Sequence, residues 1–350
     1  MVNKKQSVHN IVNQFMQSKI ELPLYVLYQQ INMDPQEVDA MRVACLATKS
    51  DESQRVAMEY LYSHGLLKDL QVLIDRNKKS DNFLNRKWAE VYQLFYNRRT
   101  FSKKSAKPGS PNQYLQQVQR MKIDNDEHSL QILHDLMHIY CYFDMHQYRY
   151  IGTYNDRIKE RLLDLNDPLL YKLLQSRLNE TLIIYHWKRN ELILSRKYGY
   201  RLLEETNNLR KKMDVHNILA QGYLFESYDQ AINHVHIAID IAKELENERA
   251  LFGLTNYTLP FISSYHCKTD GIETTDKAEQ AHLSLAKGDV QTCIAILEAF
   301  EELTPFQQYY LGLARQDKHL LRRSYQRFIE ERDDYFYAKL PLEALHAFEQ

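Results

Sequence analysis

Apolar residues recur at helical spacing along most of this chain. After Asp167 they repeat at intervals of three and four, which is the period of one helix face, at Leu169, Leu173, Leu174 and Leu178. Asp167-Pro168 precedes them as a helix start, because Pro suits the first helical position. The pattern predicts a helix that begins at about residue 168.

The same pattern predicts paired helices through the second half of the chain. A partner helix is expected over 191–205, ending near Thr206-Asn207-Asn208. Further pairs are expected over 215–225 with 228–245, 276–286 with 290–300, and 306–314 with 319–331. In the first half, single helices are expected over 7–17, 23–30, 35–47, 52–63, 66–77 and 84–96.

Corresponding helices are spaced roughly 34–38 residues apart, the period of tetratricopeptide-type repeats. Small residues such as Ala231, Ala238, Ala281 and Ala295 are expected where packed helices approach closely. A single hairpin cannot bury its own apolar face, so several must stack, and the stack presents a concave surface suited to a peptide or a partner helix.

Composition supports this fold class. The chain has 9 Gly and 8 Pro in 350 residues, about 5% where about 12% is usual, which is too few for the turns of a sheet protein. We therefore expect an all-α protein, a TPR-like superhelix of helical hairpins. Its 25 Tyr are interpreted mainly as packing residues of thin helical layers.

Four segments are expected along the chain. Residues 1–50 form an N-terminal helical region that is open to interpretation as a degenerate helix-turn-helix, residues 51–96 form helical hairpins, residues 97–112 form a basic loop, and residues 113–350 form the repeat superhelix. The loop is basic through Arg98, Arg99, Lys103, Lys104 and Lys107. Residues 1–45 carry four basic and four acidic side chains, whereas a DNA-reading domain usually presents a basic face.

Catalytic chemistry finds little support in the sequence. His134 and His138 have the spacing of zinc hydrolases, but Asp135 stands where those enzymes need Glu, so we interpret both as surface histidines. His234 and His236 are expected on different faces of one helix. No phosphate-binding or nucleophile motif occurs, and the four scattered Cys are expected to be reduced and buried. We predict no enzyme activity, no metal and no cofactor.

Recognition of a peptide is the remaining function. Amide side chains offer a donor and an acceptor together, and a cation suits a peptide carboxylate. The candidates on the expected inner helices are Asn179, Arg210, Asn217, Gln221, Asn256 and Gln280.

Several clusters together resemble the arbitrium peptide receptors, the AimR family of phage lysis–lysogeny regulators, which are related to the Rap and PlcR peptide sensors. They span about 55–345 and occur in the family's order. The clusters are Ala57-x-Glu59-Tyr60, Val72-Leu73-Ile74-Asp75, Leu224-Phe225-x-x-Tyr228-x-x-Ala231, Ala250-Leu251-x-x-Leu254-x-Asn256, Asp276-x-x-Glu279-Gln280-Ala281-His282, Tyr309-Tyr310-Leu311 and Leu340-Pro341-Leu342.

The resemblance implies a groove over about 168–345 for a peptide of about half a dozen residues. It places the family's groove Arg on Arg210, an Asn on Gln221, and one of an Asn-Asn pair on Asn256 after Thr255. Two further Asn positions fall near Ile184 and Lys188, so this part of the clamp differs. Either the protein reads a different peptide or it has lost peptide sensing.

The resemblance also implies an operator-binding helix-turn-helix and a homodimer, although the matching N-terminal and C-terminal parts are reduced here. We expect a cytoplasmic, quorum-sensing-type regulator of prophage gene expression, with a short signalling peptide and operator DNA as partners and no membrane segment. The alternative is an AimR-like protein that has lost DNA binding and acts on a protein partner as an adaptor or inhibitor.

Overall fold

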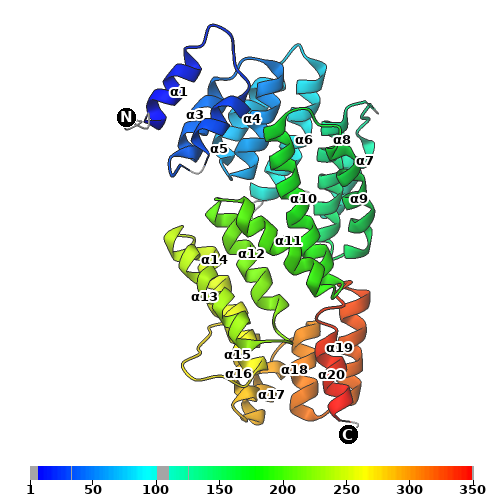
Figure 1. Cartoon of the computed structure of the whole chain (residues 1–350). Helices are drawn as coiled ribbons and strands as arrows, with labels where there is room; N and C mark the ends of the chain where they lie inside the picture. Colours follow the sequence, from blue (N-terminus) through cyan, green and yellow to red (C-terminus); the bar gives the residue numbers. More distant parts are fainter. Residues whose placement is uncertain (1–6, 33, 101–109, 125, 349–350) are drawn as a thin grey trace. The chain divides into compact units, whose positions relative to one another are not determined.

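The computed structural model describes residues 7–32, 34–100, 110–124 and 126–348. Within these ranges the secondary structure is helical and no strand occurs, as Figure 1 shows. The all-α, TPR-like class expected from the sequence is confirmed. None of the helices in the described ranges combines the length and apolar character needed to span a bilayer.

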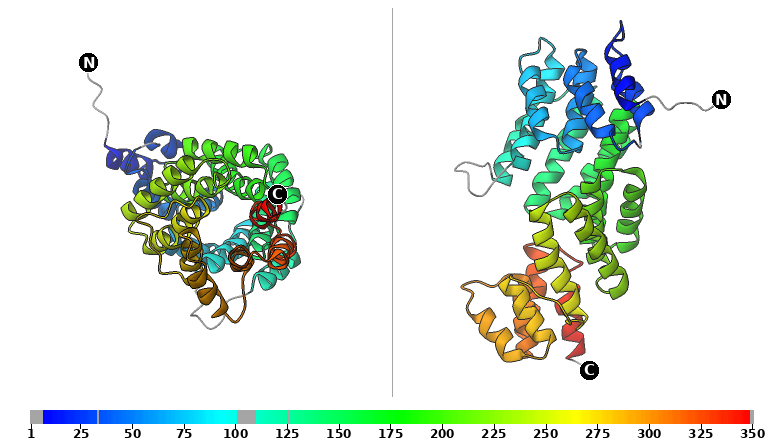
Figure 2. Two further views of the ribbon diagram at one scale, coloured as in Figure 1. Left: turned by 90° about the horizontal axis from the view of Figure 1, so that it is seen from below. Right: turned by 90° about the vertical axis from the view of Figure 1, so that its left-hand side faces the viewer.

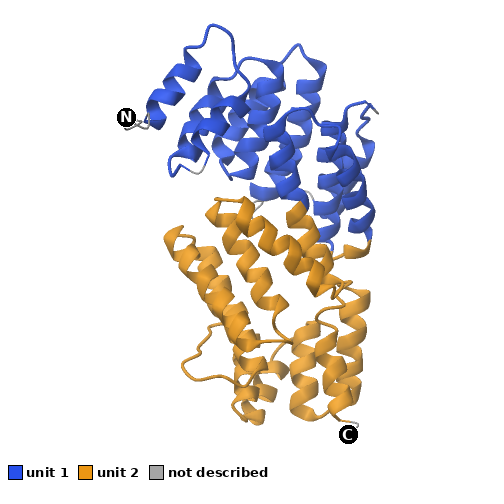
Figure 3. Cartoon of the chain, viewed as in Figure 1, with its two compact units in different colours: residues 1–145, 150–178 blue, residues 146–149, 179–350 orange. Residues whose placement is uncertain are grey.

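The chain divides into two compact units (Figure 3). Unit 1 consists of residues 1–145 and 150–178, and unit 2 of residues 146–149 and 179–350. The division falls inside one helix, α10 (Pro168–Lys188).

Unit 1 contains the helices of the N-terminal half. They are α1 (Val8–Met16), α2 (Leu24–Ile31), α3 (Glu37–Ala47), α4 (Asp51–Ser63), α5 (Leu67–Asn77), α6 (Phe83–Thr100), α7 (Pro111–Arg120), α8 (His128–Asp144), α9 (Ile151–Leu162) and the first part of α10. Neighbours along the chain, such as α5 with α6 and α8 with α9, pack together as hairpins.

Unit 2 continues with α11 (Leu192–Glu205), α12 (Leu209–Gly222), α13 (Tyr228–Glu244), α14 (Glu248–Gly253), the π-helical turn η2 (Leu254–Thr258) and α15 (Leu259–Tyr265). It ends with α16 (Lys277–Ala286), α17 (Val290–Glu298), α18 (Pro305–Arg315), α19 (Lys318–Glu330) and α20 (Lys339–Ala347). The pairs α12–α13, α16–α17 and α18–α19 pack as hairpins. Figure 2 shows these pairs turning around a common axis within unit 2.

Most predicted helix boundaries lie within one or two residues of the observed ones, and three were wrong: the start and the end of α12 and the end of α6. Helix α12 begins at Leu209, six residues before the predicted start, because the side chain of Asn208 caps it by accepting from Lys211 N. Helix α12 ends at Gly222, three residues before the predicted end at residue 225. Helix α6 continues to Thr100, beyond the predicted start of the basic loop at residue 97.

The extension of α6 gives two arginines of the predicted loop defined partners. Arg98 Nε lies 2.7 Å from Asp144 Oδ2, and Arg99 Nη1 donates to Tyr62 O at 2.5 Å. Lys103, Lys104 and Lys107 lie outside the described residues.

Two buried apolar clusters lie in unit 2. The larger one extends from Trp187 through α12–α19 to Leu345, and the smaller one consists of Ile183, Leu202, Val215 and Leu219. Ala231, Ala238 and Ala281 are fully buried in the larger cluster, as expected for close helix contacts. Ala295 is exposed, so the same expectation was wrong there. Cys267 is likewise exposed, whereas Cys45, Cys141 and Cys293 are buried as predicted.

Candidate functional site

Helix α12 carries three of the candidate peptide-binding residues. Arg210 lies in its first turn, and Asn217 and Gln221 follow seven and eleven residues later, a spacing that keeps all three on one side of a helix. Arg210 is exposed, whereas Asn217 and Gln221 are half-buried. Gln221 Nε2 donates to the backbone O of Asn217 at 3.2 Å and to its Oδ1 at 3.3 Å. Arg210, Asn217 and Gln221 thus form a row on α12, which begins with an exposed cation and continues with two amides that hydrogen-bond to each other.

Both amides also accept hydrogen bonds from distant parts of unit 2. Thr258 Oγ1, in η2, donates to Asn217 Oδ1 at 2.9 Å. The hydroxyl of Tyr337, between α19 and α20, donates to Gln221 Oε1. A peptide that used these acceptors would have to share them with Thr258 and Tyr337 or displace these side chains.

Lys188 is buried at the end of α10. Its Nζ lies 2.6 Å from Asp334 Oδ2 and 3.8 Å and 4.7 Å from the ring centroids of Trp187 and Tyr337. Burial lowers the pKa of Lys188, and the carboxylate of Asp334 opposes this shift. The backbone O of Lys188 accepts from Tyr335 N at 2.8 Å. The side chain and backbone of Lys188 therefore both hold the segment 333–337.

Asn256 and Gln280 hold the loop before α16. Asn256 Oδ1 accepts from Thr275 N at 2.8 Å and from Thr275 Oγ1 at 2.7 Å. Thr274 Oγ1 donates to the backbone O of Asn256 at 2.8 Å, and Gln280 Nε2 donates to Thr274 O at 2.9 Å. These hydrogen bonds give both amides a role in fixing this loop.

The hydrogen bonds join the candidate residues into two groups. Asn217 and Gln221 contact each other, and Lys188 joins them through segment 333–337. Asn256 and Gln280 form the second group through Thr274. Arg210 belongs to neither group and is exposed to solvent.

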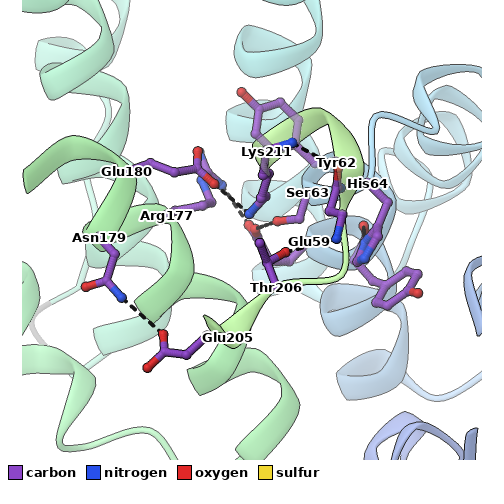
Figure 4. A network of polar contacts seen from close by, with 12 residues as sticks. Glu59, Tyr62, Ser63, His64, Arg177, Asn179, Glu180, Glu205, Thr206 and Lys211 are labelled. Carbon is purple, nitrogen blue, oxygen red and sulfur yellow. Dashed lines mark hydrogen bonds and ion pairs between the residues drawn. The ribbon is translucent and has the colours of Figure 1, made fainter. Parts of the chain in front are cut away.

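Asn179, another candidate, is fully buried and not on the surface. Its Nδ2 donates to Glu205 Oε2 at 3.3 Å. Close by, Lys211 Nζ lies 2.6 Å from Glu180 Oε1, and Figure 4 shows both contacts. The first contact joins α10 to the last residue of α11 and the second joins it to the first turn of α12, so these residues position the row that begins at Arg210.

Sequence reasoning missed three partners in unit 2: Tyr337, Asp334 and Glu279. Glu279 is 8% exposed; its Oε1 accepts from Tyr310 OH at 3.0 Å, and its Oε2, 3.6 Å from His282 Nδ1, has no hydrogen-bond partner among the described residues. A buried carboxylate oxygen without a donor is a candidate acceptor for a ligand cation. The abundance of Tyr was the available signal, since buried Tyr hydroxyls need acceptors.

Unit 1 contains a buried ion pair that the sequence did not predict. Arg177 Nη1 lies 2.7 Å from Glu59 Oε2, with both side chains at most 2% exposed. Tyr92 OH donates to the same carboxylate at 2.5 Å, and the guanidinium lies 4.4 Å from the ring centroid of Phe95. Glu59 and Arg177 are both labelled in Figure 4. The pair fastens α4 to α10 inside unit 1.

The structure contradicts the prediction for His134 and His138 and confirms the one for His234 and His236. His134 is half-buried and His138 is buried, so the surface assignment was wrong. Ligand atoms of His134, Asp135 and His138 lie within 4.8 Å of one another, yet Asp135 already binds Arg157 and Arg161. A cation would have to displace both guanidinium groups, which disfavours a metal. His234 is buried and His236 exposed, as predicted.

Comparison with known proteins connects this arrangement to a family. The family model described as AimR transcriptional regulator-like matches residues 37–347. The chain belongs to the AimR transcriptional regulator-like family. The resemblance noted in the sequence is thereby confirmed.

Members of the AimR family are also found among the similar structures. The structure of phAimR with ligand has a TM-score of 0.74 at 20% identity and covers 94% of this chain and 98% of that chain. Selenomethionine phAimR gives a TM-score of 0.71 at 18% identity, over 99% and 94% of the two chains. An uncharacterized protein of Bacillus anthracis, pXO2-35, is 24% identical over 244 residues, which is 66% of this chain and 89% of that protein.

Proposed function

We propose that this AimR-family chain is a peptide-responsive regulator that binds a short signalling peptide in unit 2 and thereby controls phage lysis–lysogeny gene expression. The observation that carries the proposal is the row on α12, in which an exposed Arg210 continues into the linked amides Asn217 and Gln221. The similarity to phAimR, which has been solved with a ligand, supports it.

The chemistry of the row suits the C-terminal end of a peptide. The exposed guanidinium of Arg210 can form two parallel hydrogen bonds with a carboxylate. Amides one or two turns further along can pair with the peptide backbone, because each offers a donor and an acceptor. Asn256 and Gln280 contribute through the loop that they fix, and Glu279 offers its unpartnered oxygen to a cationic group of the peptide.

Lys188 has a different role in this proposal. A lysine supplies only donors, and its ammonium group is already paired with Asp334. We assign it to the wall of the site, where it holds Tyr337 against Gln221. The peptide read by this chain should therefore differ from one that uses an Asn at this position.

Calorimetry tests the proposal with the secreted peptide encoded beside the gene. We expect one peptide per chain, with binding weakened at least tenfold by Arg210→Ala. Arg322→Ala, which removes an exposed arginine on α19, is the matched control and should bind normally. Equal binding by the Arg210→Ala and wild-type proteins would exclude the α12 row.

A second function, action on a protein partner without DNA, is favoured by α3. If residues 24–47 were a helix-turn-helix, α3 would be the helix that enters the DNA groove. Its exposed positions include Val38, Asp39 and Val43, and its one basic side chain, Arg42, is bound to Asp69 at 2.6 and 3.0 Å. This face offers no uncommitted cation to phosphate.

A gel-shift assay with DNA from upstream of the regulated gene separates the two functions. Phosphate contacts are strongest at low salt, so a salt-sensitive shift supports the DNA-binding regulator. No shift at low salt, combined with normal peptide binding, supports the protein-directed alternative. Homodimer formation, which the family resemblance implies, is checked in the same samples by light scattering.

A further inference from the structure

A pocket of about 230 Å³ lies in unit 1 beside two arginines. Met121 and Ile123, between α7 and α8, line it with apolar atoms, and Gln131 on α8 lines it with an amide. Arg157 and Arg161, one turn apart on α9, also line it. Every wall belongs to unit 1, whereas the residues proposed to bind the peptide belong to unit 2.

A buried carboxylate fixes both arginines. Asp135 is 2% exposed. It accepts from Arg157 Nε at 3.2 Å, from Arg157 Nη2, and from Arg161 Nη1. Arg157 also lies over the Tyr154 ring, 4.5 Å from its centroid. Both guanidinium groups are thus ordered before any ligand arrives, which lowers the entropic cost of binding an anion.

The charges of the pocket do not cancel. Two guanidinium groups and one carboxylate leave a net charge of +1. We count His134 as neutral because burial lowers its pKa, against the opposite effect of the carbonyl O of Val118, which lies 2.9 Å from its Nε2. A guanidinium has five N–H donors, and in the described part of the chain Asp135 is the sole carboxylate paired with Arg161. Donors remain for a further acceptor.

We propose that this pocket binds a small organic carboxylate, with its carboxylate on Arg161 and Arg157 and its apolar tail against Met121 and Ile123. A planar carboxylate matches the guanidinium fork, and a monoanion neutralises the net charge of +1, whereas a phosphate dianion leaves a charge of −1. The volume is below the roughly 300–1,000 Å³ of sites for drug-sized ligands, so a short acid fits and a nucleotide does not. This site goes beyond the proposed peptide function.

The test uses the full-length protein and a series of ligands. Acetate, butyrate and hexanoate are titrated by NMR and by thermal shift, with butyramide as the uncharged counterpart and inorganic phosphate as the competing anion. We expect binding that tightens by about fourfold for each methylene buried in the pocket. Butyramide and phosphate should bind at least tenfold more weakly than butyrate.

Variants locate the site. Arg161→Gln should weaken butyrate binding at least tenfold, and Lys159→Gln, which removes one positive charge from the same helix, should not. Arg161→Lys keeps the positive charge beside Asp135 but removes the planar guanidinium fork, and it should weaken butyrate binding several-fold. It replaces Arg161→Gln in the test if that variant does not fold. Met121→Ser should reduce the dependence on tail length while acetate binding persists.

Three outcomes would overturn the proposal. They are tighter binding of phosphate than of butyrate, butyrate binding that is unchanged in Arg161→Gln, and no binding of any acid to folded wild-type protein. Loss of peptide binding in unit 2 would leave each of these readouts unchanged, so failure of the two proposals can be distinguished.

Discussion

Lys188 lies near one of the asparagine positions that the family resemblance implies, and its ammonium group forms an ion pair within its own chain. An asparagine offers a donor and an acceptor, whereas an ammonium group offers donors alone. The ammonium of Lys188 lies 2.6 Å from Asp334 Oδ2, and both side chains are less than a tenth exposed. The side chain at position 188 is therefore engaged in a buried ion pair within the chain.

Removing Lys188 should destabilise unit 2 strongly. Lys188→Ala leaves the carboxylate of Asp334 buried without a cation, and breaking a buried pair from one side costs about 3–5 kcal/mol of unfolding free energy. Chemical denaturation monitored by circular dichroism measures the loss. Lys243→Ala, which removes an exposed lysine on α13, should change the unfolding free energy by less than about 0.5 kcal/mol.

The cavity left by Lys188→Ala offers a second readout. n-Propylamine can place its ammonium group beside Asp334 and should raise the melting temperature of the variant while leaving the wild type unchanged. 1-Propanol, which has the same length and no charge, should have no such effect. Equal effects of the amine and the alcohol would contradict a role for charge pairing.

His216 predicts a pH dependence of stability. Its Nδ1 lies 2.8 Å from Nδ1 of His234, so at least one of these nitrogens must be unprotonated. The pKa of His216 is lowered from 6.5 to about 4, first by burial and then by His234 and Lys212. Because the folded-state pKa lies below the unfolded one, the unfolded state binds more protons between pH 6.5 and 4, and stability falls as the pH falls through this window.

The expected loss is about 1–2 kcal/mol between pH 6.5 and pH 4, since one pKa unit corresponds to about 1.4 kcal/mol and solvent screens the half-buried His216. Urea unfolding across this window measures the slope. His216→Gln should flatten the slope, and His236→Gln, an exposed neighbour on α13, should leave it unchanged. If the slope were unchanged in His216→Gln, the pH dependence could not be attributed to His216.

At the scale of helices, close approach between α18 and α19 depends on a missing side chain. A Cβ built on Gly312 would lie 2.9 Å from Leu321 Cγ and 3.2 Å from Leu321 N. The backbone nitrogen cannot move aside as the tip of a side chain can. The small residue at position 312 therefore sets the distance between the last two repeat helices.

Gly312→Ala should destabilise the protein by about 1–3 kcal/mol, because overpacking outweighs the gain of about 1 kcal/mol in helix propensity. Gly253→Ala is the matched control, since a Cβ there meets no atom within 4 Å. It should leave the protein equally stable or slightly more stable. Thermal unfolding compares the melting temperatures of the two variants with that of the wild type. A melting temperature raised by Gly312→Ala would refute the packing argument.

The sequence predicted helices far better than it predicted the candidate site. Helix periodicity and caps are local, so Asp167-Pro168 and the pattern after it placed the start of α10 correctly. The partners of Lys188 and Gln221 lie 146 and 116 residues away along the chain. No local pattern specifies such a pairing, and so Asp334 and Tyr337 were not predicted.

At the scale of the molecule, each unit has its own buried polar anchor. Unit 1 holds Glu59 with Arg177, and unit 2 holds Lys188 with Asp334. All residues of the larger apolar cluster of unit 2 belong to that unit. Structural units with their own buried core and polar contacts typically undergo local unfolding independently of each other.

A substitution that breaks the ion pair of one unit should therefore speed amide hydrogen exchange mainly in that unit. Arg177→Met leaves Glu59 buried without its cation, and we expect faster exchange in α4, α5 and α6 with little change in α16–α19. Lys188→Ala should give the reverse pattern. Mass spectrometry of peptic fragments measures both, and uniform acceleration across the chain in either variant would contradict independent opening.

The span between Lys188 and Asp334 also has a consequence for synthesis. Ribosomes add roughly 5–20 residues per second, so about 7–30 s pass between the emergence of the lysine and that of the aspartate 146 residues later. By the end of this interval the nascent chain carries α10 to α19, and the ammonium group of Lys188 has no carboxylate partner until Asp334 emerges. The hairpins of unit 2 can form as they emerge, but the last part of the chain must arrive before the first can be buried, which makes this interval the time when a chaperone or a protease would compete most effectively with folding.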